Sequence, residues 1–438
     1  MKRRLVLAGL GAALSGCGEG SWFGERDAPP LQGKRVPVLL VGEGPTADPR
    51  IAGLTIVLPP PVPLAEWPQF GGDPTHLVGH VAGAERLEPA WRTSIGRGAP
   101  GSARMLGTPV VAAGTVVAVD ATPAVVAVAA GDGRQLWSWR PEKVRLDDRL
   151  AGGAAAIADG KVYATLHYGD VVAIPLSGGE PVWRTRLLAP LRSPPSVAGG
   201  LVLIRTADSQ LVALDAATGQ LRWRHASVLE PAAIQGGAPP AVQGRVAVTA
   251  YPSGEVVALS LDGGRPLWTE TVARPRRTLA LGSILDISGA PVIDRDRVLV
   301  AGNGGEVAAL DLRTGQRLWD APIGSHVTPW VAGEFVYLVS ERGELLCMLR
   351  QGGRIRWVSP LNEPARPEGA TAAVWAGPVL VGERLLLGSS TGELASVSPY
   401  TGEILARVRV GGRISQPPIA AGGTVYVLTD SAELVAFR

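Results

Sequence analysis

Short apolar runs alternate with turn-forming residues along most of this chain. Residues 194–223 show the pattern clearly, because four apolar or β-branched runs are separated by the glycine-rich or polar positions 199–200, 208–210 and 217–219. Short runs of this kind, bounded by Gly, Asp and Ser, are typical of β-hairpins. The pattern therefore predicts a unit of four short antiparallel strands.

The end of this four-strand unit recurs along the chain. Residues 212–223 read VALDAATGQLRW, and residues 308–319 read AALDLRTGQRLW. Weaker copies end at four more tryptophans, and a seventh copy carries Ala406 where the others carry Trp. The turn glycines of the seven copies are Gly133, Gly179, Gly219, Gly264, Gly315, Gly353 and Gly402. They lie roughly 40 to 50 residues apart, which is the period of propeller blades, and we expect each Trp to fill the wedge between two blades near the rim.

The repeat also predicts how the ring closes. Eight third strands can be counted, the last of them around Val435, and no fourth strand follows it before Arg438. Residues 87–95, around Trp91, resemble a fourth strand that lacks the other three. A four-stranded meander buries both faces only when copies stack around an axis. We therefore predict an all-β fold, an eight-bladed β-propeller of four-stranded antiparallel blades whose ring is closed by the N-terminal strand near Trp91. A β-sandwich or β-helix with coincidental tryptophan spacing is the alternative.

The amino-terminal residues have the composition of an export signal. Three basic residues at positions 2–4 precede the apolar run 5–14, which is too short to span a bilayer as a permanent helix. The tetrad LSGC that ends at Cys17 resembles the lipobox of bacterial lipoproteins. This resemblance implies that residues 1–16 are a lipoprotein signal peptide and that Cys17 is acylated. Ordinary cleavage near an unmodified cysteine is the alternative. Gly18, in place of the Asp associated with inner-membrane retention, implies a lipid-anchored location at the cell outer membrane, facing the periplasm.

Composition divides the rest of the chain in two. Residues 17–66 contain clustered prolines and are expected to form a Pro-rich tether, and residues 67–438 are expected to form the propeller. Two apolar runs inside the tether either lie against the propeller or meet a partner. The formal net charge of the whole chain is +3, and three of its basic residues belong to the signal. The remainder is close to neutral and has no cluster of basic and aromatic residues, so we expect no nucleic-acid binding.

Blades with this sequence motif also occur in pyrroloquinoline-quinone (PQQ) enzymes, so the chain can be compared with their active site. Those dehydrogenases carry an adjacent Cys-Cys pair, a calcium ion held by carboxylate and amide groups, and a catalytic Asp. Here there is no Cys-Cys pair, Cys347 is expected to be a buried hydrophobe, and the first strands are apolar.

His76 and His80 have the spacing of zinc ligands on a helix, but their Gly- and Pro-rich surroundings favour a structural role. Asp294 and Asp296 could suggest a calcium site, but they lie in an expected hairpin turn, where Asp is common. We predict no catalytic residue, no metal and no cofactor.

Signal, lipobox and propeller together resemble the BamB family, the lipoproteins of the outer-membrane β-barrel assembly machinery. The resemblance covers essentially the whole chain after the signal. The segments 67–74 (WPQFGGDP), 327–333 (VTPWVAG) and 375–378 (WAGP) are similar to the alphaproteobacterial branch. The resemblance implies a non-catalytic scaffold that binds the POTRA domains of BamA and other subunits of the assembly complex. It also implies a role in the insertion of β-barrel outer-membrane proteins, with the unfolded proteins as candidate clients.

Two motifs of the family's contact surface can be matched in this chain. The family motif Leu-x-Leu-Arg-Gly before a blade's first strand corresponds to Ile234, Gln235 and Gly236, with Gln in place of Arg. The family motif Leu-Ser-Asp-Val-Asp corresponds to the segment that contains Leu285 and Asp286, with Ser in place of the second Asp. The resemblance implies that these five residues bind the partner from two neighbouring blades. The alternative is that both loops only connect blades.

Two other functions stay open at this point. One is a PQQ-dependent dehydrogenase-like enzyme, which requires a polar funnel at the centre of the ring. The other is a propeller lipoprotein of a different envelope complex, which would differ in the partner that it binds.

Overall fold

The computed structural model describes most of the chain beyond residue 43. The described residues are 44–83, 86–99, 101, 104–142, 152–229, 237–272, 287–303, 305–362 and 372–438. Residues 44–438 belong to one compact unit. Within the described residues, the only helical element is the short 3-10 helix η1 (Pro49–Ile51), and no helix there is long and apolar enough to cross a membrane.

The described part of the chain contains 32 strands. In chain order they are β1 (Pro89–Ser94), β2 (Val110–Ala112), β3 (Thr115–Val119), β4 (Val125–Ala129), β5 (Gln135–Trp139), β6 (Gly153–Ala158), β7 (Lys161–Leu166), β8 (Asp170–Pro175), β9 (Trp183–Arg186), β10 (Ser196–Ala198), β11 (Leu201–Arg205), β12 (Gln210–Asp215), β13 (Leu221–Ala226), β14 (Ala241–Gln243), β15 (Val246–Ala250), β16 (Glu255–Ser260), β17 (Pro266–Thr271), β18 (Val292–Asp294), β19 (Arg297–Gly302), β20 (Glu306–Asp311), β21 (Arg317–Ala321), β22 (Trp330–Ala332), β23 (Phe335–Val339), β24 (Glu344–Leu349), β25 (Ile355–Pro360), β26 (Trp375–Val381), β27 (Arg384–Ser389), β28 (Glu393–Val397), β29 (Ile404–Arg409), β30 (Ile419–Ala421), β31 (Thr424–Leu428) and β32 (Glu433–Phe437).

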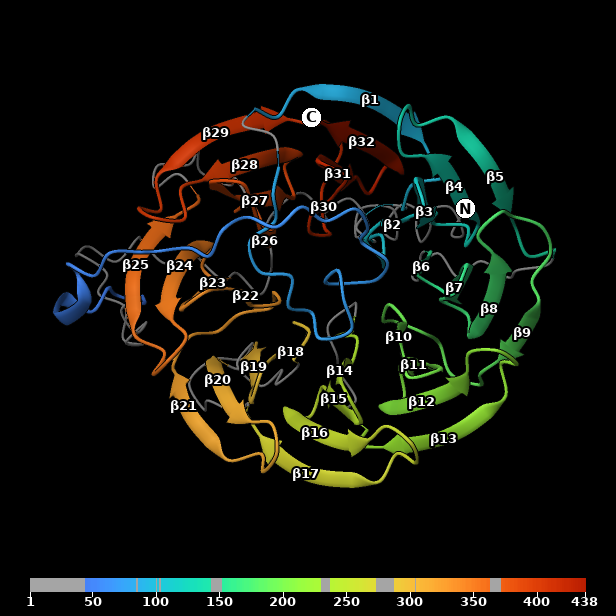
Figure 1. Cartoon of the computed structure of the whole chain (residues 1–438), viewed down its shortest axis with the longest axis horizontal. Coiled ribbons are helices and arrows are strands. Elements are labelled where there is room, and N and C mark those ends of the chain that lie inside the picture. The colour runs from blue at the N-terminus through green and yellow to red at the C-terminus, as the bar shows by residue number, and fades with distance from the viewer. Residues whose placement is uncertain are drawn as a thin grey trace, which may run out of the picture. The chain divides into compact units, whose positions relative to one another are not determined.

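These strands form eight four-stranded antiparallel sheets arranged as a ring (Figure 1). The sheets β2–β5, β6–β9, β10–β13, β14–β17, β18–β21, β22–β25 and β26–β29 are blades 1 to 7 in this order, and β30, β31, β32 and β1 form blade 8. In blades 1 to 7 the strands follow one another in chain order from the axis to the rim. The fold class predicted from the repeat is confirmed.

The amino-terminal strand closes the ring, as predicted. β1 pairs antiparallel with β32, and Trp91 lies opposite Ala436. Backbone hydrogen bonds between Glu88 and Arg438 extend this pairing. Blade 8 is therefore assembled from two distant parts of the chain, and its outermost strand is the first of the described strands.

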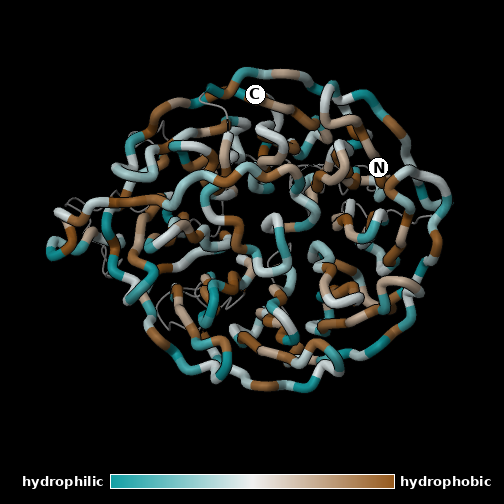
Figure 2. Tube along the Cα trace, viewed as in Figure 1, coloured by the Kyte–Doolittle hydropathy of each residue, from teal (hydrophilic) through white to brown (hydrophobic). Residues whose placement is uncertain are grey.

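Burial depends on the position of a strand in its blade. In blade 3, the four central positions of β12 are all buried, whereas the outermost strand β13 buries one residue and exposes most of the others. Middle strands are covered on both faces by the neighbouring blades, so they are nearly continuous apolar runs. Figure 2 shows the same distribution, with hydrophilic segments recurring along the outer rim.

Each rim tryptophan packs on the turn glycine of the next blade. The indole of Trp183 in blade 2 donates to the carbonyl oxygen of Ala216 in blade 3 at 3.0 Å. A Cβ on Gly219 of blade 3 would lie 2.5 Å from the Trp183 ring, and the φ of Gly219 is 71°, so this turn needs glycine for both reasons. Equivalent pairs around the ring are Trp91–Gly133, Trp137–Gly178, Trp223–Gly264, Trp268–Gly315, Trp319–Gly353 and Trp357–Gly402. In blade 2 the contact glycine is Gly178, one residue before the Gly179 expected from the repeat.

Ala406 occupies the rim position that carries a tryptophan in the other copies. The neighbouring blade has no hairpin turn against which a tryptophan could pack. Ala406 belongs to β29 of blade 7, opposite Ser396. The next blade is blade 8, whose third and fourth strands come from distant parts of the chain and are not joined by a turn. A tryptophan at position 406 would therefore have no turn glycine to cover. The closure of the ring explains why the seventh copy of the repeat lacks its Trp.

Residues 64–82, which we call the axial strap, cross the centre of the ring before β1 begins (Figure 1, blue). The strap hydrogen-bonds to blade 8 and then to blades 1 to 7 in order, so it makes one circuit of the axis. Its bonding pairs are Leu64–Gly422 in blade 8, Trp67–Val111 in blade 1, Pro68–Ile157 in blade 2, Gln69–Val197 in blade 3, Pro74–Val242 in blade 4, Thr75–Ile293 in blade 5, Gly79–Trp330 in blade 6, and Val81 with Leu380 and Gly382 in blade 7. The innermost strands are the inner edges of the sheets, and the strap pairs part of the backbone that these edges would otherwise leave unpaired.

Residues 44–63, which fall in the stretch expected to be a tether, include contacts with blade 6. The Asp48 N–H donates to the carbonyl oxygen of Ile355 at 2.8 Å, and Arg356 Nε donates to the carbonyl oxygen of Leu54 at 2.8 Å. Val62 then forms a parallel bridge with Val81 of the axial strap. The chain therefore reaches the axis along blade 6.

Trp223→Ala is expected to lower the free energy of unfolding by about 3–5 kcal/mol. The change empties a buried space between blades 3 and 4 and removes the indole hydrogen bond to the carbonyl oxygen of Leu261. Urea denaturation followed by circular dichroism measures the loss. Leu221→Ala, on the same strand but 45% exposed, is the matched control and should cost on the order of 0.5 kcal/mol. Equal losses in the two variants would contradict the proposed role of the rim tryptophan.

Gln69→Leu tests the contribution of the axial strap to stability. The side chain of Gln69 is buried and accepts a hydrogen bond from the Val197 N–H at 2.9 Å. The substitution leaves that buried N–H without its partner, so we expect unfolding to become easier by about 1–3 kcal/mol. Gln220→Leu makes the same chemical change at an exposed position and should be close to neutral. A Gln69→Leu protein as stable as this control would show that the strap adds little.

Candidate functional site

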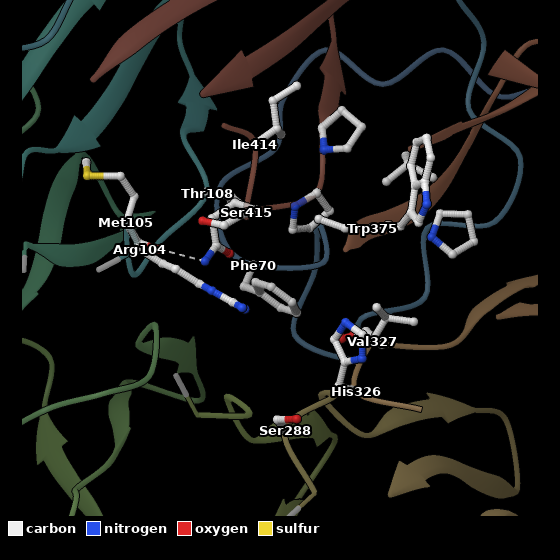
Figure 3. Close-up of a pocket in the computed structure, with 18 of the residues that line it drawn as sticks. Phe70, Arg104, Met105, Thr108, Ser288, His326, Val327, Trp375, Ile414 and Ser415 are labelled. Atoms are coloured by element: carbon white, nitrogen blue, oxygen red, sulfur yellow. Dashed lines mark hydrogen bonds between the residues drawn. The ribbon is translucent and has the colours of Figure 1, made fainter. Parts of the chain in front are cut away.

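A cavity of about 570 Å³ lies at the centre of the ring. The axial strap contributes Trp67, Phe70 and His76 to its lining, and segments that lead into the innermost strands contribute most of the rest. Figure 3 labels Phe70 from the strap among the residues around the cavity. The strap bonds to those innermost strands and to the turns that follow them, so it forms the floor of the cavity, and the leading segments form the walls. The volume lies in the range of small-molecule sites.

Aromatic rings make much of this lining apolar and flat. Trp67 stacks on Trp330, with ring centroids 6.3 Å apart and an angle of 10° between the ring planes. Phe70 meets His76 edge-on, with centroids 5.5 Å apart. Trp375 is 2% exposed and adds a further ring to the wall. Rings fixed in this way offer flat surfaces on which an apolar group can pack.

Arg104, Ser288 and His326 bring polar groups to the cavity from three separate segments (Figure 3). Buried His326 Nε2 and Ser288 Oγ have no hydrogen-bond partner among the described residues. Burial, and then the positive charge of Arg104, lowers the pKa of His326, so its ring is neutral at pH 7. In the described part of the chain, Arg104 belongs to no ion pair, and no Asp or Glu lines the cavity. The site therefore presents positive charge without a neutralising carboxylate in its described lining.

Two buried nitrogen atoms of the strap also lack partners among the described residues, Trp67 Nε1 and His76 Nε2. His76 Nδ1 lies 2.8 Å from the carbonyl oxygen of Pro291, which can only accept a hydrogen bond. Burial lowers the pKa of His76, so the ring is neutral and Nε2 carries the lone pair. The Trp67 indole N–H, a donor, and His76 Nε2, an acceptor, are therefore both buried without a partner among the described residues.

Asp430 holds one wall in place. Its carboxylate accepts hydrogen bonds from Arg413 Nε at 2.7 Å, from Ser415 Oγ at 2.6 Å and from the Met105 N–H at 3.1 Å. Gln416 Nε2 donates to the carbonyl oxygen of Met105 at 2.8 Å (Figure 3). These bonds join the segment beside Arg104 to the segment before β30. The Asp430 carboxylate is engaged by these wall residues and is not itself part of the cavity lining.

The described lining does not fit a PQQ–calcium centre. It includes no carboxylate, and the described residues contain no group of three or more His, Cys, Asp or Glu able to hold a metal ion. Cys347 is a buried free cysteine in β24, and burial raises the pKa of its thiol. His80 is bonded at both ring nitrogens to backbone carbonyl oxygens, those of Pro59 and Gly382. Asp294 pairs with Arg350 at 2.7 Å, with both side chains 5% exposed. These groups are therefore engaged in holding the fold.

The partner-binding and lipidation residues expected from the sequence lie outside the described residues. They are Cys17, Ile234, Gln235, Gly236, Leu285 and Asp286. The described chain resumes at Gly237 and Ile287 and continues into β14 and β18, which contact each other as the innermost strands of blades 4 and 5. The two motifs therefore precede adjacent blades.

The axial cavity was not expected from the sequence. Its polar residues come from segments far apart in the chain, such as Arg104, Ser288 and His326, and none belongs to the repeat. One signal was present, because the segment 67–74 concentrates aromatic and polar residues where the repeat has not begun.

Similarity to known proteins agrees with this architecture. The crystal structure of BamB from Moraxella catarrhalis superposes with a TM-score of 0.68 at 18% sequence identity, over 81% of this chain and all of that chain. Quinohemoprotein alcohol dehydrogenase from Comamonas testosteroni superposes with a TM-score of 0.65 at 16% identity, over 85% of this chain and 80% of that chain. At these identities both likenesses show the fold alone.

Sequence comparison identifies the family. Outer membrane protein assembly factor BamB from Burkholderia pseudomallei is 27% identical over 360 residues, which are 80% of this chain and 88% of that protein. The sequence model of the family described as outer membrane protein assembly factor BamB matches residues 125–359 and 362–438. The chain belongs to the family of the outer membrane protein assembly factor BamB.

Proposed function

We propose that this chain is a non-catalytic scaffold for the assembly of outer-membrane proteins. The observation that carries the proposal is the family match, which extends from β4 to β32 and so includes residues of all eight blades. The relative in Burkholderia pseudomallei is named an outer membrane protein assembly factor. A ring of stacked repeats suits this role, because it presents broad, rigid surfaces to several proteins at once.

The partner-binding surface in this proposal consists of residues 234–236 and 285–286. The POTRA domains of BamA are the proposed partner, together with other subunits of the assembly complex, and unfolded outer-membrane proteins are proposed clients. Support comes from the two family motifs and from the adjacency of β14 and β18, the strands that follow them. Isoleucine and leucine at such a surface can anchor the contact, and the remaining Asp can add charge complementarity.

The chemistry of the axial cavity supports a role without catalysis of the PQQ type. A calcium ion requires several oxygen ligands, commonly carboxylates, and no carboxylate is among the described lining residues. The likeness to a quinohemoprotein dehydrogenase therefore extends to the ring and not to the groups that its chemistry needs. Cys17, the proposed lipid anchor, would hold this ring at the periplasmic face of the outer membrane.

Ile234→Asp is expected to weaken binding to the periplasmic POTRA region of the cognate BamA by about tenfold or more, because it places a charge where the proposed contact is apolar. Biolayer interferometry with a soluble form that begins at residue 18 measures the dissociation constant. Leu318→Asp, at a 46% exposed rim position, is the matched control and should bind as the unchanged protein does. The reverse result, with loss only in Leu318→Asp, would move the interface to the rim. No binding by the unchanged protein would overturn the proposed function.

Cys17→Ala is expected to move the protein from the outer-membrane fraction to the soluble periplasm, because no acyl chain can then be attached. Fractionation with immunodetection measures the distribution, and intact mass spectrometry of the unchanged protein should show the added lipid. Cys347→Ala removes the other cysteine, which is buried in β24, and should leave the distribution unchanged. Retention of the Cys17→Ala protein in the membrane fraction would argue against the anchor.

A further inference from the structure

We propose that the axial cavity is a binding site for a small organic anion with a flat, apolar body. Arg104 supplies the positive charge, and the aromatic rings of the strap and of blades 6 and 7 supply the packing surface. The proposal does not depend on the role in outer-membrane protein assembly, because its charged and aromatic groups lie outside residues 234–236 and 285–286, although the cavity reaches their neighbours Gly237 and Ser288.

The charge of the lining selects an anion. The cavity is lined by Arg104 and Arg413, and no acidic residue is among its described lining. Arg413 is bonded to Asp430 within the wall, at 2.7 Å, whereas Arg104 belongs to no ion pair among the described residues. In Figure 3 the Arg104 side chain extends toward the Phe70 ring. A carboxylate placed there can form charge-assisted hydrogen bonds with the planar guanidinium.

The shape and the apolar character of the lining select the body of the ligand. Trp67, Phe70, Trp330 and Trp375 line the cavity, and the stacked rings of Trp67 and Trp330 have nearly parallel planes, 10° apart. A volume of about 570 Å³ accommodates a molecule of one or two fused rings with its substituents. A hydrated inorganic ion would leave most of these rings without a packing partner.

Several polar atoms of the lining residues are buried without a partner among the described residues. Trp67 Nε1 and His76 Nε2 are unpartnered among the described residues, and their side chains belong to residues 2% and 4% exposed. Ser288 Oγ and His326 Nε2, also without partners in the described structure, line the same cavity. Buried polar groups without partners are costly. A small shift of the lining toward a bound ligand would let the ligand bond to one of them and remove part of that cost.

The test titrates the full folded protein with 2-naphthoate and, in parallel, with its uncharged analogue 2-naphthamide. Isothermal titration calorimetry gives the stoichiometry and affinity, and quenching of tryptophan fluorescence reports contact with the aromatic walls. We expect one molecule of 2-naphthoate per chain and an affinity about tenfold or more above that of the amide. Equal affinity for the two probes, or no saturable binding of 2-naphthoate, would overturn the proposal.

Two variants locate the site, with thermal unfolding as a check that each is folded. Arg104→Gln should lower the affinity for 2-naphthoate by about tenfold or more and leave that for 2-naphthamide unchanged, so that the preference for the anion is lost. The control Arg134→Gln, at an exposed rim position, should preserve the preference. Ser288→Phe fills the cavity without removing any hydrogen bond of the Oγ atom and should abolish binding of both probes. Undiminished binding by both Arg104→Gln and Ser288→Phe proteins would place the probe elsewhere and overturn the assignment.

Discussion

The contact between each rim tryptophan and the turn glycine of the next blade is the interaction on which the ring depends. The indole needs a turn without a side chain, as at Gly219, and the turn needs a residue that adopts a positive φ. One residue type satisfies both needs, so a single pair of positions ties each blade to the next at every junction except that between blades 7 and 8. The same dependence explains Ala406, since the blade beside it has no such turn.

The axial strap adds a second constraint, at the axis of the ring and not at its rim. Stacked blades bury their middle strands, but their innermost strands leave an unpaired edge toward the axis. The strap pairs part of the inner backbone of every blade except blade 6, where it accepts a hydrogen bond from the Trp330 indole, and at the same time it closes one end of the central channel. The cavity above the strap therefore results from the same contacts that join the strap to the blades. Trp67, for example, bonds to Val111 of blade 1 and also lines the cavity.

The architecture was predictable because its signals are local and repeated. The Trp and Gly positions report the inter-blade contact directly, and the orphan strand around Trp91 indicated the closure that β1 makes with β32. The strap was not predictable, because it bonds mainly through backbone atoms and has no periodic pattern. The spacing of His76 and His80 suggested zinc, yet both rings bond to backbone carbonyl oxygens. The contact residues 234–236 and 285–286 rest on family motifs and stay predictions.

The circuit of the strap has a consequence for the order in which the protein can be completed. The strap and β1 precede every strand that they bind, so they leave the ribosome before any of their partners exist. Their final partners, Gly422 and β32, are among the last elements to appear. Folding must therefore wait for contacts that span nearly the whole sequence, which is slow compared with local pairing. A chain that stops before β32 would leave its first strand and the centre of its ring unfinished, so completion of the native ring reports that translation reached the last blade.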